Sequence, residues 1–292
     1  TPVTILDDDG RVVAVLVGRP LKKSGEYDDW PQVVAGLEAA INRLERDSTF
    51  SDKQSDHRRG PHRAKAFGVS HGGGQKRPSV LRQGSLRNQR AIQAFCDDEF
   101  VKRVAHFGSS AFSYYSPKLY ARYCDYLGRL RKHDPSLAWN FPQSVFPVTT
   151  VNFGPGATCY DHLDFGNAAA GWCSITAAGS YDPTLGGHLI IFDINKVIEF
   201  PPGSTILLPS SVMRHGNTPI QEGETRVGIT QYASGALFRY VDHGFRLKEE
   251  ASRAVRARVE AGAKNRFLDL LGLYSRLEEL EQDRTFVFDS ST

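Results

Sequence analysis

Six short β-strand patterns follow one another after Pro142, and they limit the folds open to this chain. They lie within about 90 residues, are separated by Gly- and Pro-containing turns, and have no helical pattern between them. The six runs are SVFPVTTVNF, GWCSITAAGS, GGHLIIFD, KVIEF, STILLPS and RVGITQYAS. Strands that are not joined by helices pair in antiparallel fashion. We therefore expect a sandwich or barrel and not a parallel βαβ sheet.

The chain on either side of this β region is predicted to be mainly helical. After a strand in RVVAVLVGRP, residues 28–47 show a helix pattern with Pro31 in the first turn. Apolar spacing predicts two further helices between residues 85 and 132, and helix again at 247–283 with a break at Gly262.

We expect a single α+β domain over the whole chain, 1–292, with a jelly-roll core and flanking helices. Its predicted parts are an N-terminal strand, helices and basic Gly-rich loop at 1–141, the β core at 142–240, and C-terminal helices at 241–292.

Positive charge is concentrated in one segment of the chain. Residues 48–90 lose apolar periodicity and contain GVSHGGGQKRPS, so they are predicted to form a long loop. From Lys53 to Arg90 there are ten Lys or Arg against one acid, a balance of +9, whereas the whole chain carries +3. Such a run is typical of a solvated or disordered loop and also of a phosphate-binding surface, and the sequence leaves both open.

Cysteine spacing and hydropathy exclude several classes of protein. The four cysteines, Cys96, Cys124, Cys159 and Cys173, form no CxxC pair, which argues against a zinc ribbon and gives little support to a disulfide framework. No apolar run approaches the roughly 20 residues that cross a bilayer, and the first residues show no secretion signal. We expect a protein of a reducing compartment with no membrane partner and no obligate protein partner.

The stretch CYDHLDFGN (159–167) places His162 two positions before Asp164. A chain with nine histidines contains about one such pair by chance, so the pair needs further support. A non-heme Fe(II) site uses two imidazoles and one carboxylate, and the second histidine must then come from a distant strand. His215 follows STILLPS and a Pro-Pro-Gly turn, and Arg226 begins RVGITQYAS, where it can bind a carboxylate of a keto-acid in bidentate fashion.

In this order and β context, residues 145–235 resemble the double-stranded β-helix of Fe(II)- and 2-oxoglutarate-dependent dioxygenases. Within that superfamily the chain is most similar to the TET/JBP group of nucleic-acid base oxygenases, in particular its fungal members. Three stretches carry the resemblance: GVSHGGGQKRPSVL, VNFGPGATCYDHLDFGN and LGGHLIIFD.

The resemblance implies the cofactors Fe(II), 2-oxoglutarate and O2. It implies three iron ligands, His162, Asp164 and His215, and it makes Arg226 the anchor for the distal carboxylate of 2-oxoglutarate. It also places His188 near the co-substrate, although an inward-facing polar residue of the barrel would fit the sequence equally well. The chain departs from the family pattern at Gly228, where many members have a polar residue.

The resemblance further implies double-stranded DNA with a flipped, methylated base as substrate. A base inside a duplex must leave the stack before it can be oxidised, which requires stacking surfaces, polar contacts and cations. The resemblance gives Asn167 as a polar base contact, Tyr232 as a stacking aromatic, and Ser70 and His71 in a loop that closes over the base. Asn167 in a turn and Tyr232 in the core are the structural alternatives. The strongest candidates for phosphate contacts are Lys76, Arg77, Arg82 and Arg87.

We therefore expect a methylcytosine dioxygenase that forms 5-hydroxymethylcytosine. The resemblance implies further oxidation to formyl and carboxyl forms and extends to demethylation of N6-methyladenine, and a DNA substrate implies a nuclear location. Two alternatives remain open: a peptidyl-prolyl or lysyl hydroxylase of the same superfamily, and a non-catalytic DNA-binding module with a vestigial pocket.

Overall fold

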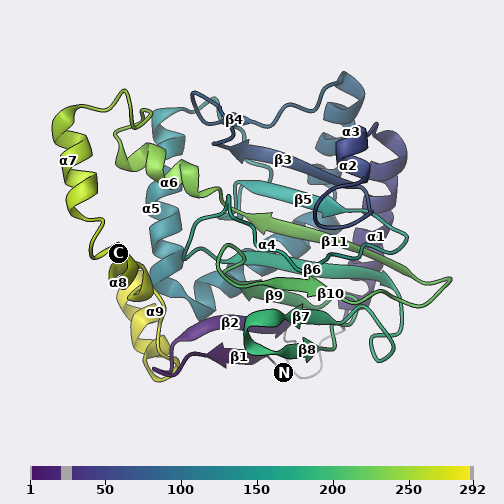
Figure 1. Ribbon diagram of the computed structural model, residues 1–292. Helices are drawn as coiled ribbons and strands as arrows, with labels where there is room; N and C mark the ends of the chain where they lie inside the picture. Colours follow the sequence, from purple (N-terminus) through teal and green to yellow (C-terminus); the bar gives the residue numbers. More distant parts are fainter. Residues whose placement is uncertain (1, 21–27, 290–292) are drawn as a thin grey trace.

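Two antiparallel β-sheets pack against each other in the computed structural model, which describes residues 2–20 and 28–289 (Figure 1). The larger sheet has the strand order β1-β2-β9-β6-β11-β5-β3-β4, and the smaller has the order β10-β7-β8. The strands of the larger sheet are β1 (Val3–Leu6), β2 (Val12–Gly18), β3 (Ala64–Ser70), β4 (Ser79–Val80), β5 (Val148–Asn152), β6 (Cys173–Ser180), β9 (Thr205–Leu208) and β11 (Thr225–Tyr232). Those of the smaller sheet are β7 (Leu189–Ile191), β8 (Lys196–Ile198) and β10 (His215–Asn217).

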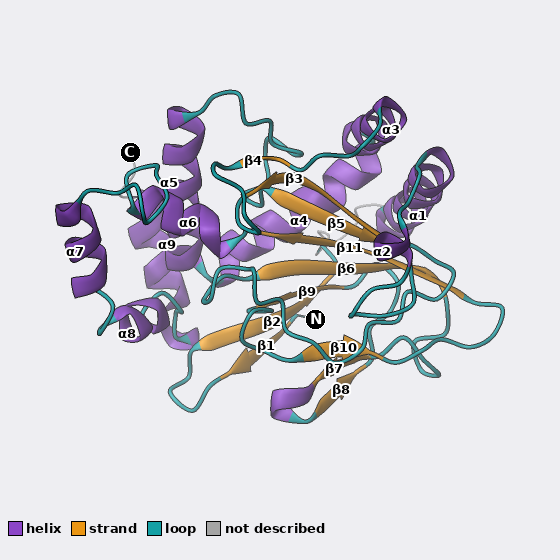
Figure 2. Cartoon of the chain, turned by 45° about the horizontal axis from the view of Figure 1, so that its top comes forward, coloured by secondary structure: helices purple, strands orange, loops and turns teal. Residues whose placement is uncertain are grey.

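The helices form two groups (Figure 2). One group packs on the outer face of the larger sheet and contains α1 (Trp30–Asp47), α3 (Leu86–Asp97) and α4 (Glu99–Tyr115). The other lies at one end of the sheets and contains α5 (Pro117–His133), α6 (Gly235–Asp242), α7 (Arg253–Ala261), α8 (Arg266–Leu271) and α9 (Leu280–Asp289). The short elements are α2 (Asp52–Ser55) and the 3₁₀ turns at Phe192–Ile194 and Leu277–Glu279. None of the helices in the described part of the chain is long and apolar enough to span a membrane.

The α+β fold class and the antiparallel core predicted from the sequence are confirmed. Each of the six predicted strand runs contains a strand, and α1 begins with Pro31 in its first turn. Its buried residues recur every three or four positions, for example Val33, Leu37, Ile41 and Leu44, because one helical face covers the sheet.

Residues 48–90 are not a single long loop, and that part of the prediction is wrong. They contain α2, β3 and β4, and β3 pairs with β5 from Ala64 to Gly68. The strand pattern is hidden because Lys65 is almost fully buried: its Nζ donates to the Thr49 carbonyl at 3.0 Å and lies 4.5 Å from the centre of the Phe50 ring. A buried, paired lysine looks like an exposed one in a sequence.

Residues 85–132 hold three helices where two were expected. Asp98 ends α3, and its carboxylate accepts hydrogen bonds from the backbone N–H groups of Phe100 and Val101, so it also begins α4. The short interruption leaves the apolar periodicity almost continuous, which is why the pattern did not reveal it.

An apolar layer between the two sheets supports the functional site. It contains Ala177 from β6, Ile206 and Leu208 from β9, and Leu189 and Ile191 from β7. These side chains fix the distance between the sheets, so residues at the ends of facing strands are brought together reproducibly.

Candidate active site

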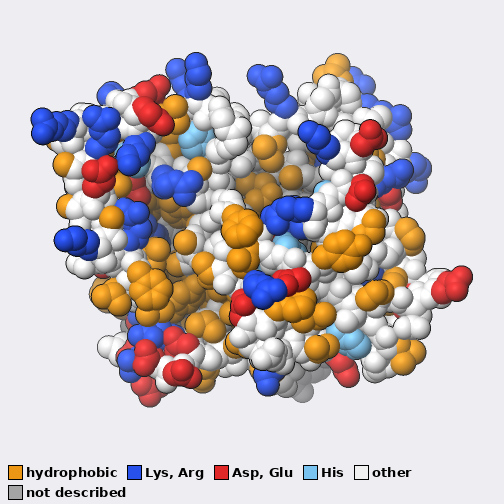
Figure 3. Space-filling model, in the orientation of Figure 1, with side chains coloured by type: hydrophobic (Ala, Val, Ile, Leu, Met, Phe, Trp, Pro, Cys, Tyr) orange, Lys and Arg blue, Asp and Glu red, His pale blue; other side chains and the backbone are white. Residues whose placement is uncertain are grey.

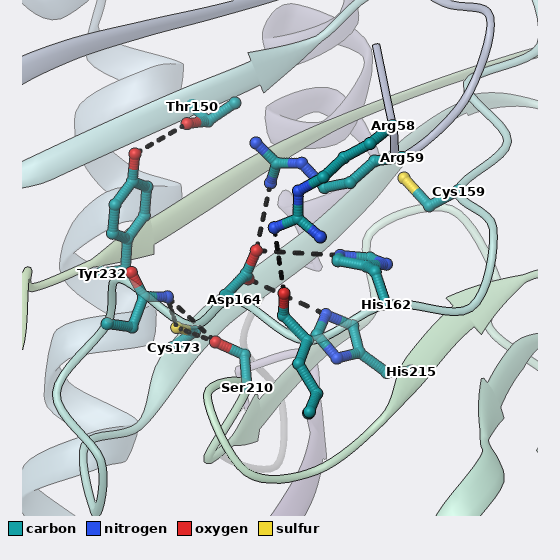
Figure 4. Close-up of polar contacts among 12 residues, drawn as sticks. Arg58, Arg59, Thr150, Cys159, His162, Asp164, Cys173, Ser210, His215 and Tyr232 are labelled. Atoms are coloured by element: carbon teal, nitrogen blue, oxygen red, sulfur yellow. Dashed lines mark hydrogen bonds and ion pairs between the residues drawn. The ribbon is translucent and has the colours of Figure 1, made fainter. Parts of the chain in front are cut away.

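His162, Asp164 and His215 converge between the two sheets (Figure 4). The Nε2 atom of His162 lies 3.8 Å from one oxygen of Asp164, and that of His215 lies 4.0 Å from the other. One ligand atom from each residue lies within 4.8 Å of the other two. The group is formed by a loop before β6 and by β10, which are about fifty residues apart in sequence.

Backbone hydrogen bonds hold the two histidines side by side. The N–H of each donates to the carbonyl of the other at 3.1 Å, and the Asp164 N–H donates to the Ser210 carbonyl at 2.9 Å. The imidazole centres are 4.3 Å apart as a result. Backbone hydrogen bonds therefore position all three residues of the site.

Both imidazoles are oriented in the same way. Nδ1 of His162 lies 2.8 Å from the Tyr160 carbonyl, and Nδ1 of His215 lies 2.9 Å from the Met213 carbonyl. A carbonyl can only accept, so each Nδ1 carries the proton and each Nε2 presents its lone pair to the centre. Burial and the neighbouring His215 lower the pKa of His162 to about 4, which keeps this imidazole neutral and able to bind a metal near pH 7.

This donor set fits Fe(II). Two neutral imidazole nitrogens and one carboxylate on one side of a site leave the opposite side open, which is the arrangement used by non-heme Fe(II) oxygenases. Among the residues that the structure describes, it is the one group of His, Cys, Asp or Glu with this geometry.

Arg226 lies in the same cavity as the triad. Its side chain is buried, and Nη1 donates to the Ala157 carbonyl at 2.8 Å. Its buried Nε has no hydrogen-bond partner in the described part of the chain. A buried guanidinium without a carboxylate partner is costly, so this residue is suited to binding an anionic ligand.

The cavity between Arg226 and the triad is narrow, with about 50 Å³ of open space. That space corresponds to only a few water molecules, so a ligand would contact its walls on every side. Both polar and apolar residues line it, and they include Asn217, Thr230, Thr176, Leu189 and Phe200. Gly228 also lines the cavity, and the hydroxyl-bearing residues in its wall are Thr230 and Thr176.

Arg58 and Arg59 brace the segment that carries the ligands, and sequence reasoning missed both. Arg59 Nη1 lies 3.3 Å from Asp164 Oδ1, and Arg58 Nη2 donates to the Leu163 carbonyl at 3.0 Å (Figure 4). Both belong to the basic segment, but an arginine in a charged run gives no spacing signal that would single it out.

His188 lies outside this cavity in the structure. Its backbone N–H donates to the Thr218 hydroxyl at 2.9 Å, and its Nδ1 lies 3.3 Å from the same hydroxyl. It is not among the residues that line the pocket of Arg226 and the triad. The co-substrate contact expected for His188 stays a prediction.

Asn167 and Tyr232 lie beside the triad. The Asn167 amide donates to the Ser210 hydroxyl at 3.0 Å and to the Cys173 sulfur at 3.2 Å. Tyr232 Oη lies 3.2 Å from the Thr150 hydroxyl, and burial raises the pKa of this phenol. In the view of Figure 4 the Tyr232 ring lies on the side of Asp164 away from His162.

The Gly-rich loop follows β3 and packs on α6. Gly72, Gly73 and Gly74 all have positive φ values, which only glycine adopts at low cost. The His71 carbonyl accepts from the Ser234 hydroxyl at 2.7 Å, and the His71 ring packs edge-on against Tyr240. Ser70 ends β3 and pairs with Ser79 of β4.

The four candidate phosphate contacts differ in their surroundings. Lys76 and Arg77 are exposed and line an open pocket with Tyr240 and Arg246, while Arg82 is exposed on the following segment. Arg87 instead donates from Nε to the Asp47 carbonyl at 2.8 Å and from Nη2 to the Arg46 carbonyl at 3.0 Å. Arg87 thus satisfies the free carbonyls at the end of α1.

No protein-family model matches this sequence, and no curated protein sequence does so either. The similarity lies in the three-dimensional structure. The structure described as NgTET1 in complex with 5mC DNA matches 80% of this chain and 76% of its own, with a TM-score of 0.56 and 17% sequence identity. The chain has the same fold as NgTET1. The double-stranded β-helix expected from the sequence is thereby confirmed.

Two further structures match this chain more weakly. A 2OG-Fe(II) oxygenase family oxidoreductase from Burkholderia pseudomallei matches 73% of this chain and 94% of its own, at 13% identity and a TM-score of 0.38. A prolyl-4-hydroxylase from Pseudomonas putida matches 69% and 86%, at 14% identity and a TM-score of 0.33. These two likenesses are too weak to bear on fold or function.

Proposed function

We propose that this protein is an Fe(II)- and 2-oxoglutarate-dependent dioxygenase that oxidises 5-methylcytosine in double-stranded DNA to 5-hydroxymethylcytosine. The observation that carries the proposal is the meeting of His162, Asp164, His215 and Arg226 in one buried cavity. The shared fold with NgTET1, whose structure contains 5mC DNA, supports the choice of substrate.

The protein groups would bind the metal and the co-substrate in fixed positions. The Nε2 atoms of His162 and His215 and one oxygen of Asp164 would hold Fe(II). With 2-oxoglutarate and O2, Fe(II) supplies the chemistry that inserts one oxygen atom into a C–H bond while the keto-acid loses carbon dioxide and becomes succinate. The second oxygen of Asp164 stays near the Arg59 guanidinium, which limits rotation of the carboxylate.

Arg226 would bind the far carboxylate of 2-oxoglutarate. Its Nη1 is fixed by the Ala157 carbonyl, its Nε has no hydrogen-bond partner in the described part of the chain, and the residue lines the cavity of the triad. Two parallel hydrogen bonds to a carboxylate fix both position and orientation, which a lysine would not do. The apolar side chains of Leu189 and Phe200 exclude water from the same space.

The polar surroundings of Asn167 favour a base with an exocyclic amino group. Both hydrogen bonds of its amide nitrogen are used by Ser210 and Cys173, and no hydrogen bond in the described part of the chain uses its Oδ1 atom. A free carbonyl oxygen accepts from the 4-amino group of cytosine and not from the 4-oxo group of thymine. Tyr232, held by Thr150, would offer a ring face to the same base.

The finer parts of the proposal follow from this chemistry. We include further oxidation to the formyl and carboxyl forms, because the same site can act again on the oxidised carbon. Demethylation of N6-methyladenine is included because adenine also presents an amino group to Asn167. A nuclear location and contacts of Lys76, Arg77 and Arg82 with DNA phosphates complete the proposal.

Incubation with a methylated duplex, Fe(II), 2-oxoglutarate and O2, followed by mass spectrometry of the nucleosides, tests the proposal. We expect loss of 5-methylcytosine, gain of 5-hydroxymethylcytosine and one succinate for each oxidation. Asp164→Ala should be inactive, whereas Asp161→Ala is the matched control, because Asp161 is exposed and pairs with Arg214 outside the triad.

The two alternative functions give different results in the same assay. A peptidyl-prolyl or lysyl hydroxylase would release succinate with a peptide substrate and show no stimulation by DNA. A DNA-binding module without catalysis would bind the duplex, leave the methyl group unchanged and show equal metal content in wild type and Asp164→Ala.

A further inference from the structure

Phe165 extends into solvent directly beside the metal site. The Asn167 N–H donates to the Asp164 carbonyl at 2.9 Å, so residues 164–167 form a β-turn with Phe165 at its second position. The side chain is 74% exposed, the largest exposed fraction of any large hydrophobic residue in the described part of the chain. A ring in this position makes no contribution to a core and needs another explanation.

An arginine holds the Phe165 ring in place. The guanidinium carbon of Arg58 lies 5.7 Å from the ring centre, and Nη2 of the same residue donates to the Leu163 carbonyl. The neighbouring Arg59 contacts Asp164. A cation–π contact thus links the ring to the segment of the metal ligands, and a positive charge accompanies it.

Other exposed apolar side chains lie close to the ligands. Tyr160 is 57% exposed and comes two residues before His162, and Val212 is 58% exposed and comes three residues before His215. Each of these side chains, like Phe165, is exposed and lies within three residues of a metal ligand in the sequence. Figure 3 shows hydrophobic, basic and some acidic side chains interspersed over the middle of this face, where Figure 1 places β10 and β11.

We propose that Phe165 stacks on a base of the substrate DNA outside the pocket, next to the nucleotide that enters the site, and that Arg58 is the residue that positions it. This inference rests on the proposed function. Removal of one base from a duplex exposes the faces of its neighbours, and an inserted apolar side chain replaces part of the lost stacking. Phe165 does not line the cavity of the triad, so it contacts a neighbouring base and not the target.

The surrounding charge identifies nucleic acid as the partner of this surface. The Arg58 guanidinium lies over the Phe165 ring, and the Arg59 guanidinium contacts Asp164. Arg214, which precedes the ligand His215, is exposed and paired with Asp161. An aromatic ring beside guanidinium groups matches a chain that alternates base faces with phosphates. An apolar peptide would gain nothing from the cations.

The first test measures binding and needs no catalysis. A duplex carries 2-aminopurine beside the 5-methylcytosine, and its fluorescence rises when that base loses its stacking partner and falls when an aromatic ring stacks on it. We expect Phe165→Ala to weaken duplex binding about ten-fold and to raise the fluorescence of the bound state. Phe165→Trp should restore both, and Arg58→Ala should show a smaller change of the same kind.

Phe267→Ala is the matched control, because Phe267 is 73% exposed and lies on α8, away from the ligands. Phe267→Ala should bind the duplex with wild-type affinity and give the wild-type fluorescence of 2-aminopurine. Equal binding and equal fluorescence in Phe165→Ala and Phe267→Ala would overturn the inference. A proline-rich peptide that binds the wild type and not Phe165→Ala, with DNA binding unchanged, would overturn it as well.

The second test separates this inference from the proposed function. In a single-stranded methylated oligonucleotide the target base does not have to be flipped out of a duplex. On this substrate Phe165→Ala should retain about a third or more of wild-type turnover, whereas its turnover on the duplex should fall about ten-fold. An equal loss on both substrates would contradict the role in stacking. If wild type oxidises neither substrate, the proposed function fails, and the fluorescence result alone decides the inference.

Discussion

The metal site and the basic segment are built in opposite ways. His162 and His215 are buried, paired through their backbones, and each holds its Nδ1 on a carbonyl two residues earlier. Lys76 and Arg77 are exposed on a loop that contains three successive positive-φ glycines, and Arg82 is exposed on the segment after β4. Metal coordination requires fixed positions, whereas phosphate contacts depend mainly on charge. Substitutions should therefore have large, specific effects in the first region and small, additive effects in the second.

The largest effect is expected for His215→Ala. Loss of one imidazole removes a ligand that the backbone holds against His162, so turnover should fall more than about a thousand-fold and Fe(II) binding should be lost. Metal analysis after equilibration with Fe(II) checks the binding. Retention of stoichiometric iron by this variant would mean that the three residues do not form the metal site.

Arg226→Ala should act on the co-substrate. The KM for 2-oxoglutarate should rise about 100-fold, which corresponds to about 2.7 kcal/mol for the loss of a buried charged partner. Arg226→Lys should recover little of this loss, because lysine lacks the planar pair of donors. Steady-state kinetics with varied 2-oxoglutarate measures the KM of each variant. An unchanged KM in Arg226→Ala would show that the keto-acid binds elsewhere.

The buried histidines should make the metal-free protein sensitive to acid. Burial and the neighbouring His57 lower the pKa of His62 from 6.5 to about 4. The unfolded chain then binds this proton more readily than the folded protein, so the stability contribution is complete above pH 6.5 and is lost as pH falls toward 4. We expect about 2 kcal/mol from His62, since part of the shift is screened by solvent.

Urea unfolding at pH 7 and pH 4.5 measures this difference in the free energy of unfolding. His62→Gln should reduce the dependence on pH, because glutamine keeps a polar contact with Asn152 and cannot bind the proton. A pH dependence that is the same in this variant and in the wild type would remove His62 as its cause.

The smallest effects are expected in the basic segment. Arg82→Ala should weaken DNA binding a few-fold on every sequence and lower the slope of log K against log salt by about 0.9. Arg87→Ala should change that slope less, because Arg87 is used by the carbonyls at the end of α1, and it should lower stability instead. Binding assays at several salt concentrations distinguish the two variants.

The sequence predicted the strands of the core because each one combines an apolar run with a Gly or Pro turn. It did not predict β10, because His215, Gly216 and Asn217 form no apolar run and pair with β7 only through the backbone. It did not predict β3, because Lys65 interrupts the apolar pattern and its burial depends on Thr49 and Phe50. Local pattern is thus informative where a strand contributes apolar side chains, and uninformative where tertiary contacts alone define it.

The site shows the same division. His162, Asp164 and His215 follow from residue type and strand order, which the sequence displays. Arg59 could not be singled out, because its contact with Asp164 joins residues 105 positions apart and one arginine among many carries no signal. No sequence pattern identified Phe165 as a functional residue either, because its exposure is a property of the folded turn.

The most direct test of the central claim is an anaerobic titration of the protein with Fe(II) and 2-oxoglutarate, followed by visible absorption. A keto-acid that chelates Fe(II) gives a metal-to-ligand charge-transfer band. The account predicts this band in wild type and in Asp161→Ala, and its loss in Asp164→Ala. In Arg226→Ala the band should form only at an about 100-fold higher concentration of 2-oxoglutarate. A wild-type protein that shows no such band with saturating Fe(II) and 2-oxoglutarate would contradict the account.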